Sequence, residues 1–428
     1  MKHYIVYHRD CLDGFVSAIL VYTRALFLGT ENIVMIPANY GEGPVNVKSG
    51  DTVTLVDFSY SSEVIDKMLK YGANVVIADH HKTAIEDIAG NIKKAINNEE
   101  SQYPFKGMTF DSDINIVADG NQYPLSSNSL QDYLNCIPVV DICNCIDDDF
   151  SLFSDLIFKD KNPCSKFAGY LAYSDANGKN NISKRSAAGI VYQKLKGTIS
   201  NKTENQLKFI LGNDIGRLVE LAQSHDLWLH DGDYTDKAMQ LSYWFKHFKE
   251  ETDDITKSLQ ELPNLSADKL LRHSELSVAL FELLRKNFLS TTLNEKLAIG
   301  KEILDKDVFI IKEILKDTKT VKLNDSICSD VKVGYIHDER LKKVGVSLTG
   351  SIMVRDGGYD VAILSTPNHP EESDIIYSLR SNGKGSNVDL TNITKHFVSK
   401  GIASTGGGHV NAAGMKVKKE LSFFEIIS

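Results

Sequence analysis

Short apolar runs alternate with helical patterns over the first part of the chain, and this alternation restricts the fold more than any other feature. β-branched and aromatic residues form runs that predict strands at 4–7, 33–36, 52–56 and 74–77. Between them, apolar residues recur at helical spacing over 15–28 and 61–71. Strands that alternate with helices are typical of βαβ units, so we expect an α/β fold with a parallel sheet.

A second α/β block is expected at the C-terminal end. The stretch 237–317 contains few residues that break helices and has clear amphipathic segments. Beyond it, the pattern predicts strands at 331–336, 359–364, 375–379 and 412–417, and helices at 340–354 and 390–400.

The segment at about 86–181 interrupts the first block with polar stretches rich in Asn, Asp and Ser. A bare loop of this length is improbable in a compact domain, so we expect an insertion with some structure of its own. The predicted organisation is therefore an N-terminal domain at 1–295, a helical connector at 296–325 and a smaller C-terminal α/β domain at 326–428.

Composition limits the class of protein and of partner. A hydrophobic content of 42% with 25% charged residues is ordinary for globular proteins. No apolar stretch predicts a membrane span, no signal-peptide pattern is seen, and the six cysteines are scattered, so we expect a cytoplasmic protein with reduced thiols. The net charge of −9 argues against a broad surface for long nucleic acid, whereas a small anionic substrate is compatible with it.

Metal-type ligands follow several of the expected strands. His8, Asp57 and the run Asp79-His80-His81 each come directly after a strand, and His225-Asp226 follows a helical segment. The carboxyl ends of parallel strands line the crevice in which ligands bind, so these side chains should converge. One strand-end Asp is most often a helix N-cap, and Asp57 alone would be read in that way. The joint occurrence of all four favours a metal site.

These residues also resemble a known family. Asp79-His80-His81 at a strand end is the signature of the DHH phosphoesterases, and HRDCLDG at 8–14, Asp57 in VDFS and Asp226 in SHDLW stand where that family has its other motifs. Near the C-terminus, STGGGHVNAAG at 404–414 and the preceding segment 378–390 resemble the DHHA1 substrate-binding domain. The chain thus resembles a DHH/DHHA1 phosphoesterase of the nanoRNase or oligoribonuclease-like kind over nearly its whole length.

The resemblance implies a centre with two metal ions. His8 would bind one ion, Asp13 the other, and Asp57 would bridge both. His80 and Asp226 would complete the shell of the second ion. Mixed imidazole and carboxylate ligands favour Mn²⁺, with Mg²⁺ as the alternative.

Three residues are expected to take part in catalysis. Asp57 would act through the shared metal ions, His81 would face the phosphate, and Asp79 would orient the neighbouring histidine. Two divalent ions about 3.5–4 Å apart can activate a water and balance the charge that develops on the phosphate.

The chain departs from the family pattern at one position. The family commonly has an Asp two residues before the Asp that precedes Gly14, and here that position is Cys11. We expect Asp10 to supply the ligand instead, because a thiolate beside a hard ion is a poorer match. The alternatives are that the first ion has fewer carboxylate ligands and that Asp10 is only a loop acid.

The C-terminal motif predicts a clamp for the substrate. Glycines let a backbone approach phosphate closely with positive φ, although a glycine run alone would be read as a turn. An arginine can hold phosphate through two hydrogen bonds. The residues expected to bind substrate are Arg380, Gly406, Gly407, Gly408, His409 and Asn411.

The function that the resemblance implies is hydrolysis of short oligonucleotides or linear dinucleotides to nucleoside monophosphates by a metal-activated water. One alternative is a cyclic-dinucleotide phosphodiesterase, and another is a nucleotide-binding regulator that has lost activity. The sequence does not decide whether the substrate is RNA or DNA, from which end it is attacked, what the insertion does, or which oligomer forms.

Overall fold

The computed structural model describes residues 1–81, 84, 87–88, 115–118, 121–124, 140–143, 167–171, 186–198, 211–227, 233–260, 267–323, 331–366, 374–381, 388–409 and 411–418. Contacts divide the chain into two compact units. The first comprises Met1–Ser174 and Asn180–Lys301, and the second comprises Asp175–Lys179 and Glu302–Ser428. None of the helices in the described ranges combines the length and apolar character that a membrane span needs.

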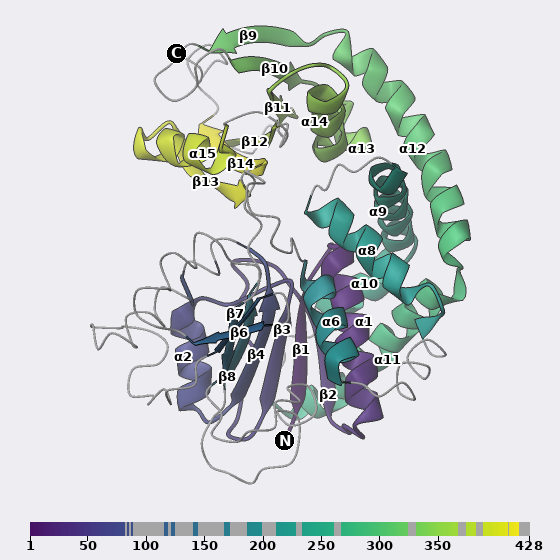
Figure 1. Cartoon of the computed structure of the whole chain (residues 1–428), viewed down its shortest axis with the longest axis vertical. Coiled ribbons are helices and arrows are strands. Elements are labelled where there is room, and N and C mark those ends of the chain that lie inside the picture. Colours follow the sequence, from purple (N-terminus) through teal and green to yellow (C-terminus); the bar gives the residue numbers. More distant parts are fainter. Residues whose placement is uncertain are drawn as a thin grey trace. The chain divides into compact units, whose positions relative to one another are not determined.

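A mostly parallel sheet forms the centre of the first unit (Figure 1). Its strands, in spatial order, are β2 (Ile33–Ala38), β1 (His3–His8), β3 (Thr52–Val56), β4 (Asn74–Asp79), β8 (Phe167–Leu171) and β7 (Val140–Cys143). All neighbours pair in parallel except β7 and β8. The predicted α/β class with a parallel sheet is therefore confirmed.

Strands from the expected insertion extend this sheet. β8 pairs in parallel with β4, from Val75 opposite Phe167 to Asp79 opposite Leu171, and β7 pairs with β8. A separate hairpin joins β5 (Asn115–Ala118) to β6 (Asn121–Pro124). The sequence did not predict β7 and β8, because these short runs lie between long polar stretches that hide their period.

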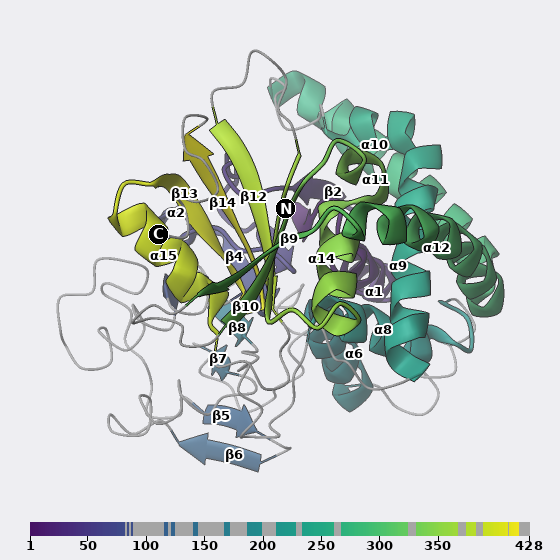
Figure 2. The same ribbon diagram turned by 90° about the horizontal axis from the view of Figure 1, so that it is seen from above.

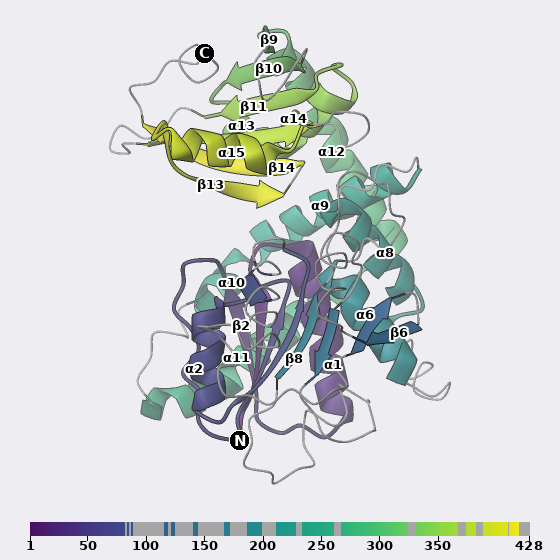
Figure 3. The ribbon, with the colours of Figure 1, turned by 60° about the vertical axis from the view of Figure 1, so that its left-hand side comes forward.

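Helices cover both faces of the first sheet. They are α1 (Leu12–Phe27), α2 (Ser62–Lys70), α6 (Ala187–Thr198), α8 (Ile215–Asp226), α9 (Asp233–Glu251), α10 (Asp253–Gln260), α11 (Ala267–Ser290) and the beginning of α12 (Leu293–Leu315). Figures 1 and 3 show the strands between α2 and α1. Alternate residues of β1 point to opposite faces of the sheet. Accordingly, Ile5 packs in the core beside α1, and Val6 packs in the core beside α2.

A buried histidine in β1 predicts how stability depends on pH. His3 is 1% exposed, and its Nε2 lies 2.8 Å from Oγ1 of Thr54. Burial lowers the pKa of His3 to about 4. Between pH 6.5 and pH 4, His3 is therefore protonated in the unfolded state and mostly neutral in the folded state. Stability should therefore fall as the pH falls from 6.5 towards 4, by about 2 kcal/mol from this group between pH 7 and pH 5.

Urea unfolding at pH 7 and pH 5 measures this loss, with His3→Gln as the comparison. The variant keeps a polar group near Thr54 but cannot titrate, so its free energy of unfolding should fall by less over the same interval. Equal losses in the two proteins would show that His3 does not cause the dependence.

The second unit contains a mixed sheet. Its strands, in spatial order, are β13 (Ala403–His409), β14 (Ala412–Lys418), β12 (Asp374–Ser381), β11 (Val361–Ser365), β10 (Val331–His337) and β9 (Lys319–Leu323). The helices α14 (Val346–Arg355) and α15 (Leu390–Ser399) lie on opposite sides of it (Figure 2). The predicted helix at 340–354 is divided into α13 (Leu341–Val344) and α14, because Gly345 between them has a φ of 85°.

The glycine run of the second unit forms a strand where a ligand-binding loop was expected. Gly406 and Gly407 pair with Met415 and Gly414 of β14. Only Gly408 of the three has the expected positive φ, at 138°, and a Cβ there would lie 2.5 Å from the carbonyl oxygen of Ala412. Gly408 therefore allows close contact between the two strands, and a period-two pattern of side chains cannot reveal such a contact.

Candidate metal centre

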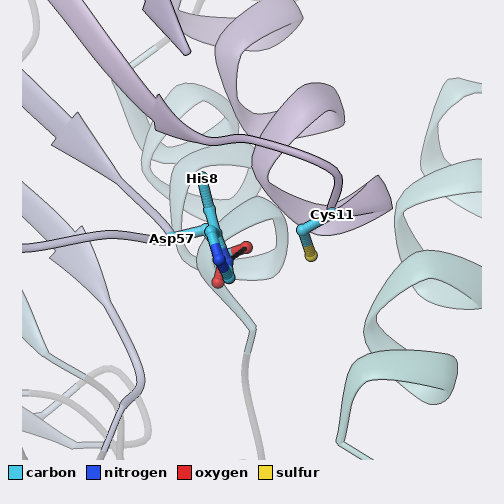
Figure 4. A group of neighbouring side chains, drawn as sticks. All are labelled: His8, Cys11 and Asp57. Atoms are coloured by element: carbon cyan, nitrogen blue, oxygen red, sulfur yellow. Dashed lines mark ion pairs between the residues drawn. The ribbon is translucent and has the colours of Figure 1, made fainter. Parts of the chain in front are cut away.

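The first unit gathers the ligand-type side chains that the sequence singled out. His8 ends β1, Asp57 follows β3, His80 follows β4, and Asp226 is the last residue of α8. Figure 4 shows His8 and Asp57, from the ends of β1 and β3, with Cys11 beside them on the loop just before α1. The parallel arrangement thus brings residues from distant parts of the chain to one edge of the sheet.

Asp57 lies at the middle of this group. Its side chain is fully buried, its Oδ1 lies 3.0 Å from Nε2 of His80, and its Oδ2 lies 3.5 Å from Nδ1 of His8. Burial alone would raise the pKa of Asp57, but the contacts with His8 and His80 outweigh burial and lower it. Its φ of 53° is uncommon for a residue with a side chain, and such strain is typical of functional sites.

One buried oxygen of Asp57 lacks a hydrogen bond of good geometry. Among the residues that the structure describes, none donates a hydrogen bond of good geometry to Oδ2 of Asp57, although this atom is buried. A buried carboxylate oxygen without a donor is costly unless a cation neutralises it. This atom therefore fits a metal ligand.

Two further carboxylates lie close to Asp57. Oδ2 of Asp226 is 2.8 Å from Nε2 of His80. Asp13, in the first turn of α1, accepts a hydrogen bond from the hydroxyl of Ser186 and from the backbone N–H of Ala188 at 3.2 Å. Burial raises the pKa of Asp13 well above its usual value, and the negative charges of Asp57 and Asp226 raise it further.

The imidazole of His80 joins these acids. Burial alone would lower the pKa of His80, but Asp226 and Asp57 beside it raise the pKa well above 6.5. Acids in contact with an imidazole stabilise positive charge at this point of the site. The same stabilisation is available to a bound cation.

His81 is fixed by Asp79. Nδ1 of His81 lies 2.7 Å from Oδ1 of Asp79, which also accepts hydrogen bonds from the backbone N–H groups of His80 and His81. Burial alone would lower the pKa of His81, but Asp79 raises it. Asp79 therefore orients His81 and favours its protonated form.

Three groups of these residues have the spacing of a metal site. Within each group the ligand atoms all lie within 4.8 Å of one another. The groups are His8 with Cys11 and Asp57; Asp57 with His80 and His81; and Asp13 with Asp57, His80 and Asp226. Asp57 belongs to all three, so its carboxylate could be shared by two cations.

Asp10 lies apart from these groups. Its side chain is 62% exposed and forms an ion pair with Lys249 of α9, and its φ is 45°. The structure brings Cys11 to the position beside His8 and Asp57 instead. Burial raises the pKa of the Cys11 thiol well above its usual value, and Asp57 raises it further, so the neutral thiol is favoured.

A cavity of about 700 Å³ opens beside the metal-type ligands within the first unit. It is lined by residues of the loop before α1 and the start of α1, of α8, and of α9 and the start of α10: Asp10, Cys11, Leu12, Asp13, Ala222, His225, Asp226, Ser242, Phe245, Lys246, Lys249, Glu250 and Asp253. Asp13 and Asp226 thus face both the candidate centre and the cavity. Lys246 and Lys249 are the lysines of its wall.

Sequence reasoning missed several residues of the site. Ser186, which follows the expected insertion in the sequence, donates a hydrogen bond to Asp13. Its position just before a helical pattern is the only sequence signal for it. Lys249 lines the cavity from α9. The amphipathic pattern of this helix is equally consistent with a lysine exposed to solvent. Tyr40 follows a strand but carries none of the atoms that usually indicate a metal ligand.

The residues expected to bind substrate belong to the second unit. The guanidinium of Arg380 donates hydrogen bonds to the hydroxyls of Ser378 and Ser347 and to the carbonyl of Leu379. Burial lowers the pKa of Arg380 to about 10. Oδ1 of Asn411 accepts a hydrogen bond from Ser381 at 3.2 Å. The backbone of His409 lies in β13, and its side chain falls outside the described part of the chain.

Comparison with known proteins gave matches only among solved structures. No protein-family model and no curated protein sequence matches the chain. The chain is similar to a structure described as the DHH domain of a member of the s1p family of ribosomal proteins, with 14% identity, a TM-score of 0.44, and 97% of this chain and 83% of that chain covered.

Two further matches have similar values. The pGpG-specific phosphodiesterase PggH from Vibrio cholerae has 12% identity and a TM-score of 0.41, with 98% of this chain and 94% of that chain covered. Exonuclease RecJ bound to manganese has 11% identity and a TM-score of 0.40, with 98% and 86% covered. Each similarity is distant, so the role of the candidate centre is inferred from its own residues.

Proposed function

We propose that this chain is a phosphodiesterase of the DHH/DHHA1 type that hydrolyses short oligonucleotides or linear dinucleotides to nucleoside monophosphates. Its cofactors would be two divalent cations, with Mn²⁺ favoured by the mixed ligands. The residues that would hold them are His8, Asp13, Asp57, His80 and Asp226.

The position of Asp57 carries this proposal. Its buried carboxylate belongs to every candidate ligand group, and its Oδ2 receives no hydrogen bond from the described residues. Each oxygen of Asp57 also faces an imidazole that is itself a candidate ligand, Oδ1 that of His80 and Oδ2 that of His8. An acid held between two sets of ligands is suited to sharing two metal ions.

The chemistry follows from the side chains around the centre. When bound, two divalent cations would supply a water that ionises near neutral pH and would balance the charge on the phosphate. Asp79 holds His81 through Nδ1 beside the candidate ligands, where the imidazole would face the phosphate. Because Asp79 favours the protonated imidazole, His81 can donate a hydrogen bond to a phosphate oxygen.

Lys249 is expected to bind the substrate. It lines the cavity next to Asp13 and Asp226, where a phosphate group would need positive charge. Replacing Lys249 by Met should raise KM about three- to tenfold and leave bound metal unchanged, because the contact is partly exposed. The matched control is Lys67→Met on α2, where the lysine pairs with Glu63 at the surface. Loss of metal, or the same change in both variants, would contradict this role.

Substrate length separates this function from that of a processive nuclease. The net charge of −9 provides little attraction for a long polyanion, and a cavity of about 700 Å³ is in the size range of small-ligand sites. We expect kcat/KM with Mn²⁺ to be highest for oligomers of about two to five nucleotides, because further phosphates gain no counterion release. A length series of labelled RNA and DNA at fixed ionic strength measures this. Efficiency that climbs steadily with length would contradict it.

The same assay, with cyclic dinucleotides and nucleotide binding added, decides between the alternatives. Preferential cleavage of cyclic dinucleotides would assign the chain to that substrate class. Binding of nucleotides without turnover of any substrate would favour the inactive regulator.

A further inference from the structure

An aromatic surface borders the candidate metal centre on the side of β2. Tyr40, just after β2, is 51% exposed, whereas Phe58 behind it is 1% exposed. The rings of Tyr40 and Phe58 lie 5.1 Å apart with an interplanar angle of 38°, so the two rings are in tilted contact. Tyr60, also buried, meets Phe58 at 5.0 Å and anchors this pair in the core.

The ring of Tyr40 also contacts the histidines of the centre. Its centroid lies 5.8 Å from that of His8 and 5.6 Å from that of His81, with interplanar angles of 67° and 74°. The ring of Tyr40 thus lies among Phe58 and the two histidines, while about half of the residue remains exposed, at 51%. This exposed aromatic residue borders the side chains that would hold metal and phosphate.

The loop that carries Tyr40 is held in place. Arg9 forms an ion pair with Glu42 through two contacts, at 2.8 Å and 2.9 Å, and donates a hydrogen bond to the carbonyl of Pro37. Glu42 in turn accepts a hydrogen bond from the backbone N–H of Asn39 at 3.1 Å. Asn39, before Tyr40, and Glu42, two residues after it, are therefore held by these contacts, which restrict the turn that carries Tyr40.

We infer that Tyr40 is a stacking surface for the base of the nucleotide whose phosphate binds at the centre. A preorganised aromatic ring gains about 1–3 kcal/mol per stacked base and accepts any base, because every base has a π face. The affinity for a nucleotide should therefore depend on whether a base is present more than on which base it is. This inference rests on the proposed function, since it assumes that phosphate binds beside His81.

Binding of two small probes tests the inference without turnover. Adenosine 5′-monophosphate and ribose 5-phosphate share the sugar and phosphate and differ in the base. In the full chain with Mn²⁺, calorimetry should show tighter binding of the nucleotide by about ten- to a hundredfold. Tyr40→Phe keeps the ring and should keep this ratio. Tyr40→Leu keeps apolar bulk and should reduce the ratio to nearly one by weakening nucleotide binding alone.

Other outcomes overturn the inference. Equal weakening of both probes in Tyr40→Leu would mean that Tyr40 only supports His8 and His81. An unchanged ratio in Tyr40→Leu, or a wild-type protein that binds both probes equally, would place the base elsewhere. Hydrolysis of a dinucleotide by the same preparations is measured in parallel, so that loss of the proposed function is seen separately from loss of base stacking.

Discussion

Replacement of Asp57 by Asn is expected to lower kcat by on the order of a thousandfold or more, because it removes a charge that both cations would share. The effect should be on chemistry and not on folding. Asn has nearly the same shape as Asp, and it tolerates the φ of 53° found at this position. A circular dichroism spectrum and a melting curve close to those of the wild type are therefore expected.

A second buried aspartate serves as the control for this variant. Asp66 of α2 is 3% exposed and pairs with Lys70 at the surface, outside all candidate ligand groups. Asp66→Asn should change stability slightly and activity little. Near wild-type turnover of Asp57→Asn under saturating Mn²⁺ would contradict the assignment of Asp57.

Removal of divalent metal is expected to abolish turnover and to destabilise the first unit. Asp13, Asp57 and Asp226 are close together, and the raised pKa of Asp13 reflects burial first and then repulsion from the other two acids. Bound cations relieve this repulsion. At a free Mn²⁺ concentration of 100 times Kd, binding should stabilise the folded state by about 2.7 kcal/mol.

Thermal melting with EDTA and with added Mn²⁺ measures this stabilisation, and hydrolysis of a dinucleotide is followed in the same samples. Wild-type protein should melt at a higher temperature with Mn²⁺ and regain activity when metal is returned. The shift in Asp57→Asn should be smaller, because one shared ligand charge is lost. Turnover that survives EDTA, with no shift in melting temperature, would argue against metal chemistry at this site.

Much of the fold was predictable from local pattern. The strand expected at 52–56 coincides with β3, and the helix expected at 390–400 matches α15 within one residue, because both have strong periodicity and clear ends. β8 was missed, since it lies between long polar stretches and gains its stability from pairing with β4. β13 was missed because its three glycines have no side chains to show a strand period.

The candidate centre was predictable only in part, because local pattern does not reveal loop conformation or contacts between distant segments. Residues at the ends of parallel strands can be expected to meet, and His8, Asp57 and His80 do lie together. Which residue of a loop turns inward depends on backbone angles that the sequence does not reveal, so Asp10 points to Lys249 while Cys11 lies beside His8. Contacts between distant helices, such as that of Ser186 with Asp13, depend on tertiary packing.

Under the proposed function, Asp57 would lie between two bound cations. Anomalous diffraction at the manganese edge, from crystals of the full chain grown with Mn²⁺, tests it most directly. We predict two anomalous peaks per chain, both in contact with the carboxylate of Asp57, because this residue belongs to all three ligand groups. No peak at this place, or peaks that do not touch Asp57, would contradict the account.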